Sequence, residues 1–276
     1  MTSPTQLYIP PASMLPSAYP ASPTRMLLVG GAGRGKTFSA MTFPNPIICD
    51  LDNKLNGYKQ FKPTHEFHAI PFWNTKFVTE VCKCNNAGPG KPFNPKYPAN
   101  TRDAFKYWLI EEGPKLTKEQ TLIVDSWTSM HTAFDLQSKL PHEVVWSTKT
   151  GQEDGFAFWG RKKQYSKEIV DALKALSCNV VVIAHETFER DENGRIIGLK
   201  ALQDGSYADE LPTQFTDVYR QHVFTKEEAA KRGLKQDENI AYWWQTDKDQ
   251  YFTFACKSKP SLPAFVTADY SSLTNN

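Results

Sequence analysis

The sequence predicts an α/β fold with a mostly parallel central sheet, helices on both faces and antiparallel strands at its C-terminal edge. Three observations predict it. A glycine-rich loop joins an apolar run at 25–29 to a helix-forming segment. Further apolar runs alternate with segments of helical periodicity, which is typical of parallel strands joined by right-handed crossovers. After residue 186 the pattern changes to alternating residues around turns, which favours antiparallel hairpins.

The order of elements follows from these patterns. Apolar runs too short for helices predict strands at 25–29, 47–52, 121–125 and 180–184. Helices are expected at 101–113, where Thr101 supplies the cap, at 127–140 and at 159–177, with an irregular segment at 141–158. One hairpin is expected at 187–200 around Asn193-Gly194, and another from 240–245 to 251–256.

We expect a single folded domain at 25–270 that carries an irregular insertion at about 60–100. Residues 1–24 are rich in proline and small polar residues, which favours a flexible arm, and residues 271–276 form a short tail. The arm could alternatively dock on a neighbouring subunit through the apolar residues at 7–9.

The composition is ordinary for a globular protein, and its charge and cysteine content limit the partners and the compartment that we expect. Against 32 Lys and Arg stand 30 Asp and Glu, so the net charge of +2 gives no global field for nucleic acid, and such binding would need local patches. Five cysteines, an odd number, favour reduced thiols. Because no segment resembles a membrane span or a signal peptide, we expect a cytoplasmic protein with no membrane partner.

The loop itself is the most informative motif. Residues 30–37 fit G-x-x-x-x-G-K-[ST], whose backbone N–H groups form an anion nest at a helix N-terminus. Lys36 would reach the β- and γ-phosphates of ATP, and the Thr37 hydroxyl would bind Mg²⁺. The predicted nucleotide contacts are Gly30, Gly31, Ala32, Gly33, Arg34, Gly35, Lys36, Thr37 and Phe38.

Two further positions complete the predicted chemistry. Asp125 ends a buried strand, where a carboxylate would hold Mg²⁺ with Thr37. Ser126, which follows it, is a poor base. The neighbouring strand offers Asp50 and Asp52 two residues apart and therefore on one face. Asp52 lies nearer the tip and is our candidate general base, although it could simply begin a turn.

His185 closes the next strand and could report the γ-phosphate to the hairpin that follows, or could simply cap the backbone. That hairpin carries Arg190 and Arg195. Near the C-terminus, Lys257 and Lys259 could enter a neighbour's nucleotide site as trans-acting fingers, or remain a solvated pair. The candidate DNA contacts, which interleave with or follow aromatic residues, are Lys149, Arg161, Lys162, Lys163, Arg190 and Arg195.

Zinc is disfavoured. His65 and His68 precede Cys82-x-Cys84, but the two cysteines are closer in sequence than zinc motifs require, and the histidines come first.

Together these motifs resemble the RecA-like ATPases. The run 48–52 resembles the family's strand ending in Asp-x-Glu, with Asp52 in place of the glutamate, and 182–185 resembles its strand ending in a polar sensor. Residues 254–259 resemble its finger strand, with Lys259 where Arg is frequent. More narrowly, Asp204–Tyr207 and Phe215–Arg220 resemble compact phage-encoded members associated with single-strand annealing and recombination.

The resemblance implies an ATPase that acts on single-stranded DNA as a homo-oligomer, a ring or a filament. Two alternatives remain. The chain could be an interaction module, such as a helicase loader or scaffold, that binds ATP with little turnover. A P-loop kinase is disfavoured because the segment 141–163 holds a single arginine, Arg161, where a lid would need several.

Overall fold

The computed structural model describes residues 22–54, 57, 67–72, 101–138, 146, 151, 154–203 and 207–274. The expected arm up to residue 21, most of the expected insertion and the last two residues of the tail lie outside this range. So do Lys149, His65, Cys82 and Cys84, so the predictions that involve them are not examined by the structure. Among the described helices, none is both long and apolar enough to cross a bilayer.

Nine strands form the sheet within the described residues. They are β1 (Arg25–Gly30), β2 (Pro46–Asp50), β3 (His68–Pro71), β4 (Thr121–Asp125), β5 (Asn179–Arg190), β6 (Ile196–Ala201), β7 (Asp217–Thr225), β8 (Ile240–Gln245) and β9 (Phe265–Thr267). The helices are α1 (Lys36–Ala40), α4 (Thr101–Glu111), α5 (Trp127–Ser138), α6 (Gly155–Lys174), α7 (Tyr207–Glu210), α8 (Lys226–Lys231) and α9 (Ser271–Thr274), with 3₁₀ turns at Gly113–Lys115 and Leu211–Gln214.

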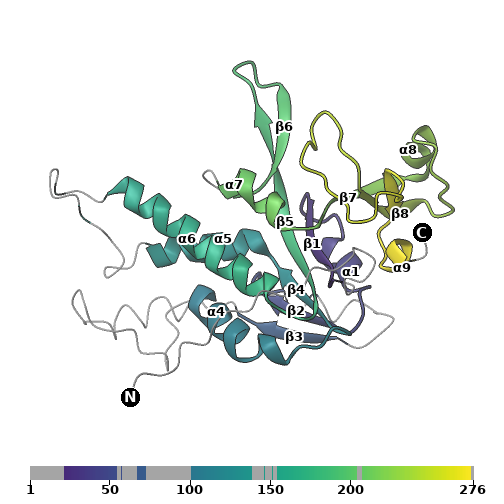
Figure 1. Ribbon diagram of the computed structural model, residues 1–276. Helices are drawn as coiled ribbons and strands as arrows, with labels where there is room; N and C mark the ends of the chain where they lie inside the picture. The colour runs from purple at the N-terminus through teal and green to yellow at the C-terminus, as the bar shows by residue number, and fades with distance from the viewer. Residues whose placement is uncertain are drawn as a thin grey trace, which may run out of the picture.

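The strand order is β3-β2-β4-β5-β1-β7-β8-β9, with β6 paired to β5 (Figure 1). The pairs from β3 to β7 are parallel, and β7-β8 and β8-β9 are antiparallel. The parallel strands end at one edge, so the loop after β1 and the residues after β2, β4 and β5 lie together. The predicted α/β fold class is confirmed, including its antiparallel edge.

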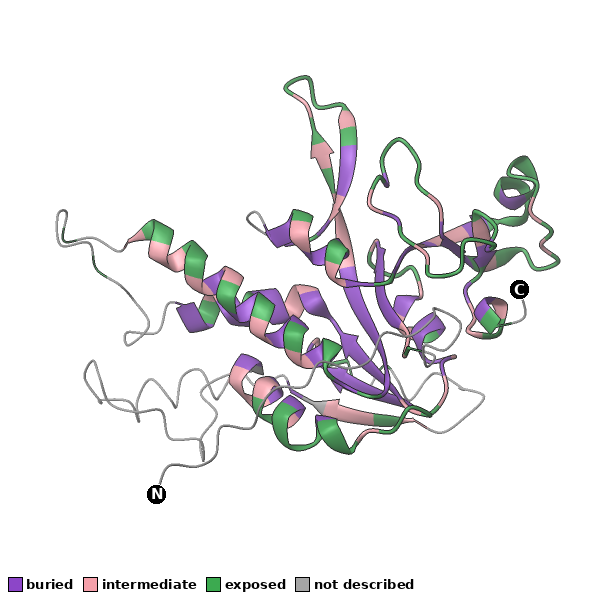
Figure 2. Ribbon diagram, viewed as in Figure 1, coloured by how far each residue is buried: buried purple, intermediate pink, exposed green. Residues whose placement is uncertain are grey.

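Helices cover both faces of the sheet. On one face, apolar residues of α4, α5 and α6 pack on the sheet; on the other, α1, α9 and the segment before β9 do so. Every residue of β1 and β4 is buried, and Figure 2 shows the central strands as the buried layer of the molecule. A parallel sheet covered on both faces reads in sequence as continuous apolar runs, which is why these strands were predictable.

The long helix, the insertion and the tail differ from the prediction. The long helix begins at Gly155 because the Asp154 carboxylate caps it, accepting hydrogen bonds from the N–H groups of Phe156 (2.9 Å) and Ala157 (3.3 Å). The expected irregular insertion contains β3, a parallel edge strand beside β2. The tail contains the last short helix, α9.

The strand that contains His185 does not end there. β5 runs on to Arg190, and beyond the sheet it pairs with β6 as a two-stranded ribbon, which projects from the body in Figure 1. Gly194 closes the hairpin with φ 76°, so the expected turn at Asn193-Gly194 is confirmed.

The second expected hairpin is wrong. β8 pairs with β7 and β9, and the segment 251–256 holds only an isolated bridge, between Val218 and Cys256. The Asp249 carboxylate accepts hydrogen bonds from the N–H groups of Tyr251 (2.7 Å) and Phe252 (2.6 Å). Such a side-chain-closed turn competes with strand pairing, and the alternating sequence does not reveal it.

Candidate nucleotide-binding site

The glycine-rich loop joins β1 to α1 with a backbone that only glycine adopts easily. Gly33 and Gly35 have φ of 70° and 76°. At Gly35 a Cβ atom would also lie 2.5 Å from the ring of Tyr242, so a side chain there would collide with β8. Ala32, Gly33 and Arg34 are exposed at the tip of the loop. The predicted strand–loop–helix context of the motif is therefore present.

Lys36 lies inside this loop. Its ammonium donates to the carbonyl oxygens of Gly30 (2.8 Å) and Gly31 (2.7 Å), and the side chain is buried. Burial lowers the pKa of Lys36 to about 8, and the negative charge of Asp125 opposes that shift. The ammonium is thus held against the first two residues of the loop, and a bound phosphate group would replace their carbonyl oxygens as its partner.

The two residues predicted to bind Mg²⁺ are adjacent. Thr37 Oγ1 donates a hydrogen bond to Asp125 Oδ2 at 2.6 Å, joining the start of α1 to the end of β4. A hydroxyl and a carboxylate are the hard oxygen ligands that Mg²⁺ prefers, and Mg²⁺ commonly takes only one or two protein ligands beside substrate phosphates and water. The pair therefore fits the metal that the motif implies.

Asp52 is placed differently from the prediction. β2 ends at Asp50, and the buried Asp50 carboxylate accepts hydrogen bonds from the N–H groups of Asp52 (3.2 Å) and Lys54 (2.8 Å), which closes a turn. Asn53 in that turn has φ 57°. The two carboxylates therefore do not share one strand face, because the strand has already ended where Asp52 stands.

Three donors hold the Asp52 carboxylate. Oδ1 accepts hydrogen bonds from Ser126 (2.8 Å) and Ser129, and Oδ2 pairs with the ammonium of Lys54. Burial acts to raise the pKa of Asp52, but the bonds from Lys54, Ser129 and Ser126 outweigh it, so the pKa is lowered. Asp52 is thus ionised and positioned next to β4, and its role as a general base stays a prediction.

His185 lies directly beside the loop, paired in register with Gly30. Its Nδ1 is 3.4 Å from Lys36 Nζ, and its backbone N–H donates to Thr128 Oγ1 at 3.0 Å. Burial, together with the charges of Lys36 and Lys54, lowers the pKa of His185. A neutral imidazole can accept a hydrogen bond from Lys36. His185 therefore lies next to the P-loop lysine, and its role as a sensor stays a prediction.

Two charged residues that sequence reasoning missed form an ion pair beside the loop. Glu186 Oε2 pairs with Arg220 Nε at 2.8 Å, and a second bond of 3.3 Å joins Oε1 to the same guanidinium. Both side chains are mostly buried. This bidentate pair ties β5 to β7 beside Gly31. The position of Glu186 directly after the predicted sensor could have indicated a role beside the loop. Its partner Arg220 is remote in sequence, so the pair itself could not be predicted.

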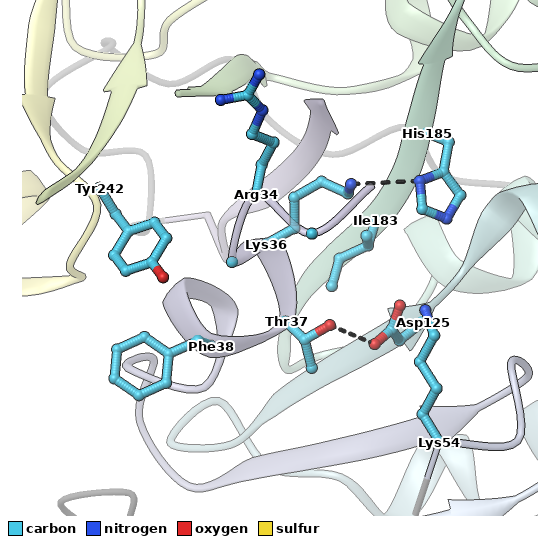
Figure 3. A pocket seen from close by; sticks show the side chains of 11 residues that line it. Arg34, Lys36, Thr37, Phe38, Lys54, Asp125, Ile183, His185 and Tyr242 are labelled. Carbon is cyan, nitrogen blue, oxygen red and sulfur yellow. Dashed lines mark hydrogen bonds between the residues drawn. The ribbon is translucent and has the colours of Figure 1, made fainter. Parts of the chain in front are cut away.

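A cavity of about 520 Å³ lies at the loop (Figure 3). Loop residues 33–38 line it together with Lys54, Asp125, Ile183, His185 and Tyr242. The rings of Phe38 and Tyr242 stand at one side with centroids 6.3 Å apart, and both are partly exposed. Tyr242 and Lys54 were not predicted. Tyr242 comes from β8, which no local motif connects to the loop.

The candidate trans fingers are engaged within their own chain. The ammonium of Lys257 donates to the carbonyl oxygen of Leu262 and pairs with Asp247, each at 2.6 Å. The ammonium of Lys259 donates to the carbonyl oxygen of Leu273. Neither lysine stands on a strand, so the expected finger strand is wrong, and a role in a neighbour's site stays a prediction that requires these contacts to break.

The candidate DNA contacts divide into two groups. On α6, Lys162 is contradicted as a surface contact, because its side chain is 4% exposed and its ammonium pairs with Asp135 at 3.3 Å. It also lies 4.7 Å from the Trp159 ring centre, so these residues are packed together. Lys163 pairs with Glu210, and Arg161 donates to the carbonyl oxygen of Ser138 at 3.3 Å.

The second group is on the projecting hairpin. Arg190 and Arg195 are both exposed, and the guanidinium of Arg190 donates to the carbonyl oxygen of Gly194 at 2.7 Å. Beside them, Phe188 and Ile197 are also exposed. The strand that carries Arg190 is the same strand that carries His185, so the two lie on one element.

The loop, its buried lysine and the Thr37–Asp125 pair define a P-loop nucleotide-binding protein. Residues 22–243 match a family described as an AAA domain, and the chain belongs to that family. A solved structure of the RadB recombinase is similar at 11% sequence identity and a TM-score of 0.33, over 82% of this chain and 89% of that one. No curated protein matches the sequence.

Proposed function

We propose that the chain is a Mg²⁺-dependent ATPase that acts on single-stranded DNA as a homo-oligomer. One observation carries the nucleotide part of this proposal. The P-loop ammonium, the Thr37 hydroxyl and the Asp125 carboxylate face one cavity, with Thr37 Oγ1 and Asp125 Oδ2 2.6 Å apart. A nucleoside triphosphate bound with its metal needs a cation for the phosphates and oxygen ligands for the metal. Lys36 supplies the cation, and Thr37 and Asp125 supply two metal ligands.

The chain's own groups account for binding. The loop N–H groups and the Lys36 ammonium bind phosphate oxygens, and Thr37 with Asp125 would hold Mg²⁺, which when bound neutralises charge on the β- and γ-phosphates. The Phe38 and Tyr242 rings offer apolar faces at the side of the cavity. Because a purine stacks well on aromatic rings, we assign them to the nucleobase.

For hydrolysis, Asp52 is the candidate base. Its carboxylate is ionised, is anchored by Ser126 and Ser129, and lies beside β4. An anchored carboxylate can orient water against the γ-phosphate and accept its proton. The lowered pKa of Asp52 also makes it a weak base, which supports slow turnover.

The DNA part of the proposal rests on the projecting hairpin. Arg190 and Arg195 are exposed there, close in sequence to Phe188, and cations with an aromatic ring suit a single strand. The sensor residue His185 stands on the same strand, which would couple nucleotide state to the hairpin. In the assembly, Lys257 or Lys259 of a neighbouring copy would complete each site. With the RecA-like resemblance, this supports a role in phage-type recombination or annealing in a host cytoplasm.

One experiment tests the proposal. ATP hydrolysis is measured with and without oligo-dT, and particle size is followed in the same samples. We expect single strands to stimulate turnover, and ATP to enlarge the particles. The R190A/R195A variant should lose stimulation, whereas K115A/K231A, which also removes two exposed positive charges, should keep it. If oligo-dT does not change the rate of ATP hydrolysis by the wild-type protein, the proposed action on single-stranded DNA is contradicted.

A second function is favoured by one observation. Both Asp52 oxygens are engaged by donors of the same chain, which suits a protein that binds ATP and hydrolyses it little. Such a protein would be a nucleotide-dependent loader or scaffold. Tight ATP binding with negligible turnover, even when single strands are present, would select this reading.

A further inference from the structure

Lys54 lies in the nucleotide cavity although no part of the P-loop motif accounts for it. It lines the cavity together with Lys36, Thr37 and Asp125, and Figure 3 shows its side chain extending toward Asp125. Its side chain is 47% exposed, whereas that of its ion-pair partner Asp52 is 7% exposed. The pair therefore has an anchored carboxylate and an accessible ammonium.

The backbone holds Lys54 at this place. Both oxygens of the buried Asp50 carboxylate accept a hydrogen bond from the N–H of Lys54, at 3.0 and 2.8 Å. Asp50 is in turn paired in register with Asp125, because β2 and β4 are neighbours. The turn after β2 is thus fixed against the strand that carries the metal ligand, while the lysine side chain beyond it stays accessible.

The electrostatics place the lysines and the histidine at one site. Burial is the largest cause of the lowered pKa of both Lys36 and His185, and the charge of Lys54 adds to it in each case. The nearby carboxylates of Asp52, Asp125 and Asp50 balance the charge of Lys54. A terminal phosphate entering this cavity would offer Lys54 a doubly charged oxyanion in exchange for a single carboxylate oxygen.

We propose that Lys54 is a further catalytic residue, which contacts the terminal phosphate of the bound nucleotide from within the same chain. This inference rests on the proposed function. When the ammonium moves to that phosphate it leaves Asp52 Oδ2, while Ser126 and Ser129 keep Oδ1 in place. The presence of a γ-phosphate is thereby what frees the candidate base.

The chemical step is hydrolysis of the terminal phosphoryl group. The oxygen of water forms a bond to the γ-phosphorus, and the bond from that phosphorus to the bridging oxygen breaks, its electron pair leaving with ADP. The proton of the water goes to Asp52 Oδ2 and afterwards to solvent. Lys54 stabilises negative charge on the phosphoryl oxygens, as an arginine finger would from another chain.

The test compares two nucleotides that differ in the terminal phosphate. Affinities of the full-length protein for ATPγS and ADP are measured by calorimetry with Mg²⁺, and kcat and KM for ATP are measured alongside. For K54A we expect ATPγS affinity to fall about tenfold or more while ADP affinity changes less than about twofold. We expect kcat to fall by about 100-fold. K54R should recover part of both losses.

The controls separate the possible failures. K115A removes an exposed lysine from the turn after α4 and should behave as wild type. K36A should weaken both nucleotides. If wild-type protein binds neither nucleotide, the proposed function fails and this inference with it. If wild type binds and K36A does not, but K54A keeps the wild-type ratio of ATPγS to ADP affinity, only the inference on Lys54 is overturned.

A purely structural role gives a different result. It would lower the affinity for both nucleotides by one factor and would lower the unfolding midpoint without ligand. That outcome also overturns the inference. Should K54A fold poorly, K54Q keeps most of the side chain and is judged by the same affinity ratio.

Discussion

The hydroxyl of Thr37 donates to the carboxylate of Asp125 across 2.6 Å, joining the first turn of α1 to the end of β4. The two residues are 88 positions apart in sequence. Thr37 stands in α1, which follows β1, and β5 lies between β1 and β4 in the sheet. Their closeness depends on the parallel order of β1, β5 and β4, which brings the ends of all three strands to one edge. The fold therefore creates the oxygen pair that suits Mg²⁺.

Asp125 should consequently control the metal dependence of nucleotide binding. We expect D125A to lose the gain in ATP affinity that Mg²⁺ gives wild-type protein, by about tenfold or more, because one charged ligand is gone. Calorimetry with Mg²⁺ and with EDTA measures this. D171N removes a carboxylate from α6, away from the cavity, and should retain the full metal effect. Equal metal dependence in D125A and wild type would refute the assignment.

Tyr242 should contribute to binding of the base and not of the phosphates. We expect Y242A to weaken ATP binding about tenfold, since stacking of a base on an aromatic ring is worth roughly 1–3 kcal/mol. Binding of inorganic triphosphate should be unchanged. Y107A removes an exposed tyrosine from α4 and serves as the matched control. A loss of triphosphate affinity equal to the loss of ATP affinity would show that the ring acts on the loop.

The ion pair between Glu186 and Arg220 should stabilise the sheet beside the loop. Its side chains are 11% and 14% exposed, so removing one partner leaves the other poorly solvated. We expect E186Q to lower the free energy of unfolding by roughly 1–3 kcal/mol, measured by urea denaturation. Glu189 stands on the same strand as Glu186, and its ion pair with Lys200 is more exposed. E189Q should therefore lower the free energy of unfolding by less than about 1 kcal/mol. Similar losses of unfolding free energy in E186Q and E189Q would contradict the larger contribution expected of the Glu186–Arg220 pair.

His222 should make stability depend on pH. Burial lowers its pKa from 6.5 to about 4, and the ring is hydrogen-bonded to Gln245 at 2.8 Å. As the pH falls from 6.5 towards 4, the unfolded chain takes up a proton at this residue that the folded chain excludes. Stability should therefore fall across that window, by at most about 3 kcal/mol, and then level off.

Urea titrations at several pH values check this prediction, with H222N as the comparison. The variant keeps a neutral polar side chain and should show a shallower loss of stability between pH 6.5 and 4. The difference between the two curves isolates His222 from the acidic groups that also titrate there. Parallel curves would mean that His222 does not contribute.

Much of the fold could be predicted from the sequence, because β1 and β4 are buried on both faces and therefore appear as continuous apolar runs. It failed at turns closed by side chains. The Asp50 carboxylate closes a turn directly after β2, and the Asp249 carboxylate closes a turn where a strand was expected to begin at residue 251. In both cases the carboxylate accepts hydrogen bonds from backbone N–H groups a few residues ahead. Apolar periodicity does not register such local hydrogen bonds.

The residues of the candidate site were also only partly predictable from the sequence. The motif residues Lys36 and Thr37 were predictable because the loop supplies phosphate chemistry from one short segment. Tyr242 and Arg220 were not, because they reach the loop only through the pairing of β7 with β1 and β8. Lys54 was overlooked since a lysine after a turn has no periodic or motif signature, and only the cavity reveals its place.

The central claim is that residues 30–37 bind a nucleoside triphosphate through Lys36. Calorimetry of ATP with Mg²⁺ on wild-type protein and on K36A tests it most directly. We expect saturable binding of one ATP per chain in the wild type, and an affinity lower by about 100-fold or more in K36A, because the loop would lose its buried ammonium. Undetectable ATP binding by the wild type, or equal affinity in the two proteins, would contradict the claim.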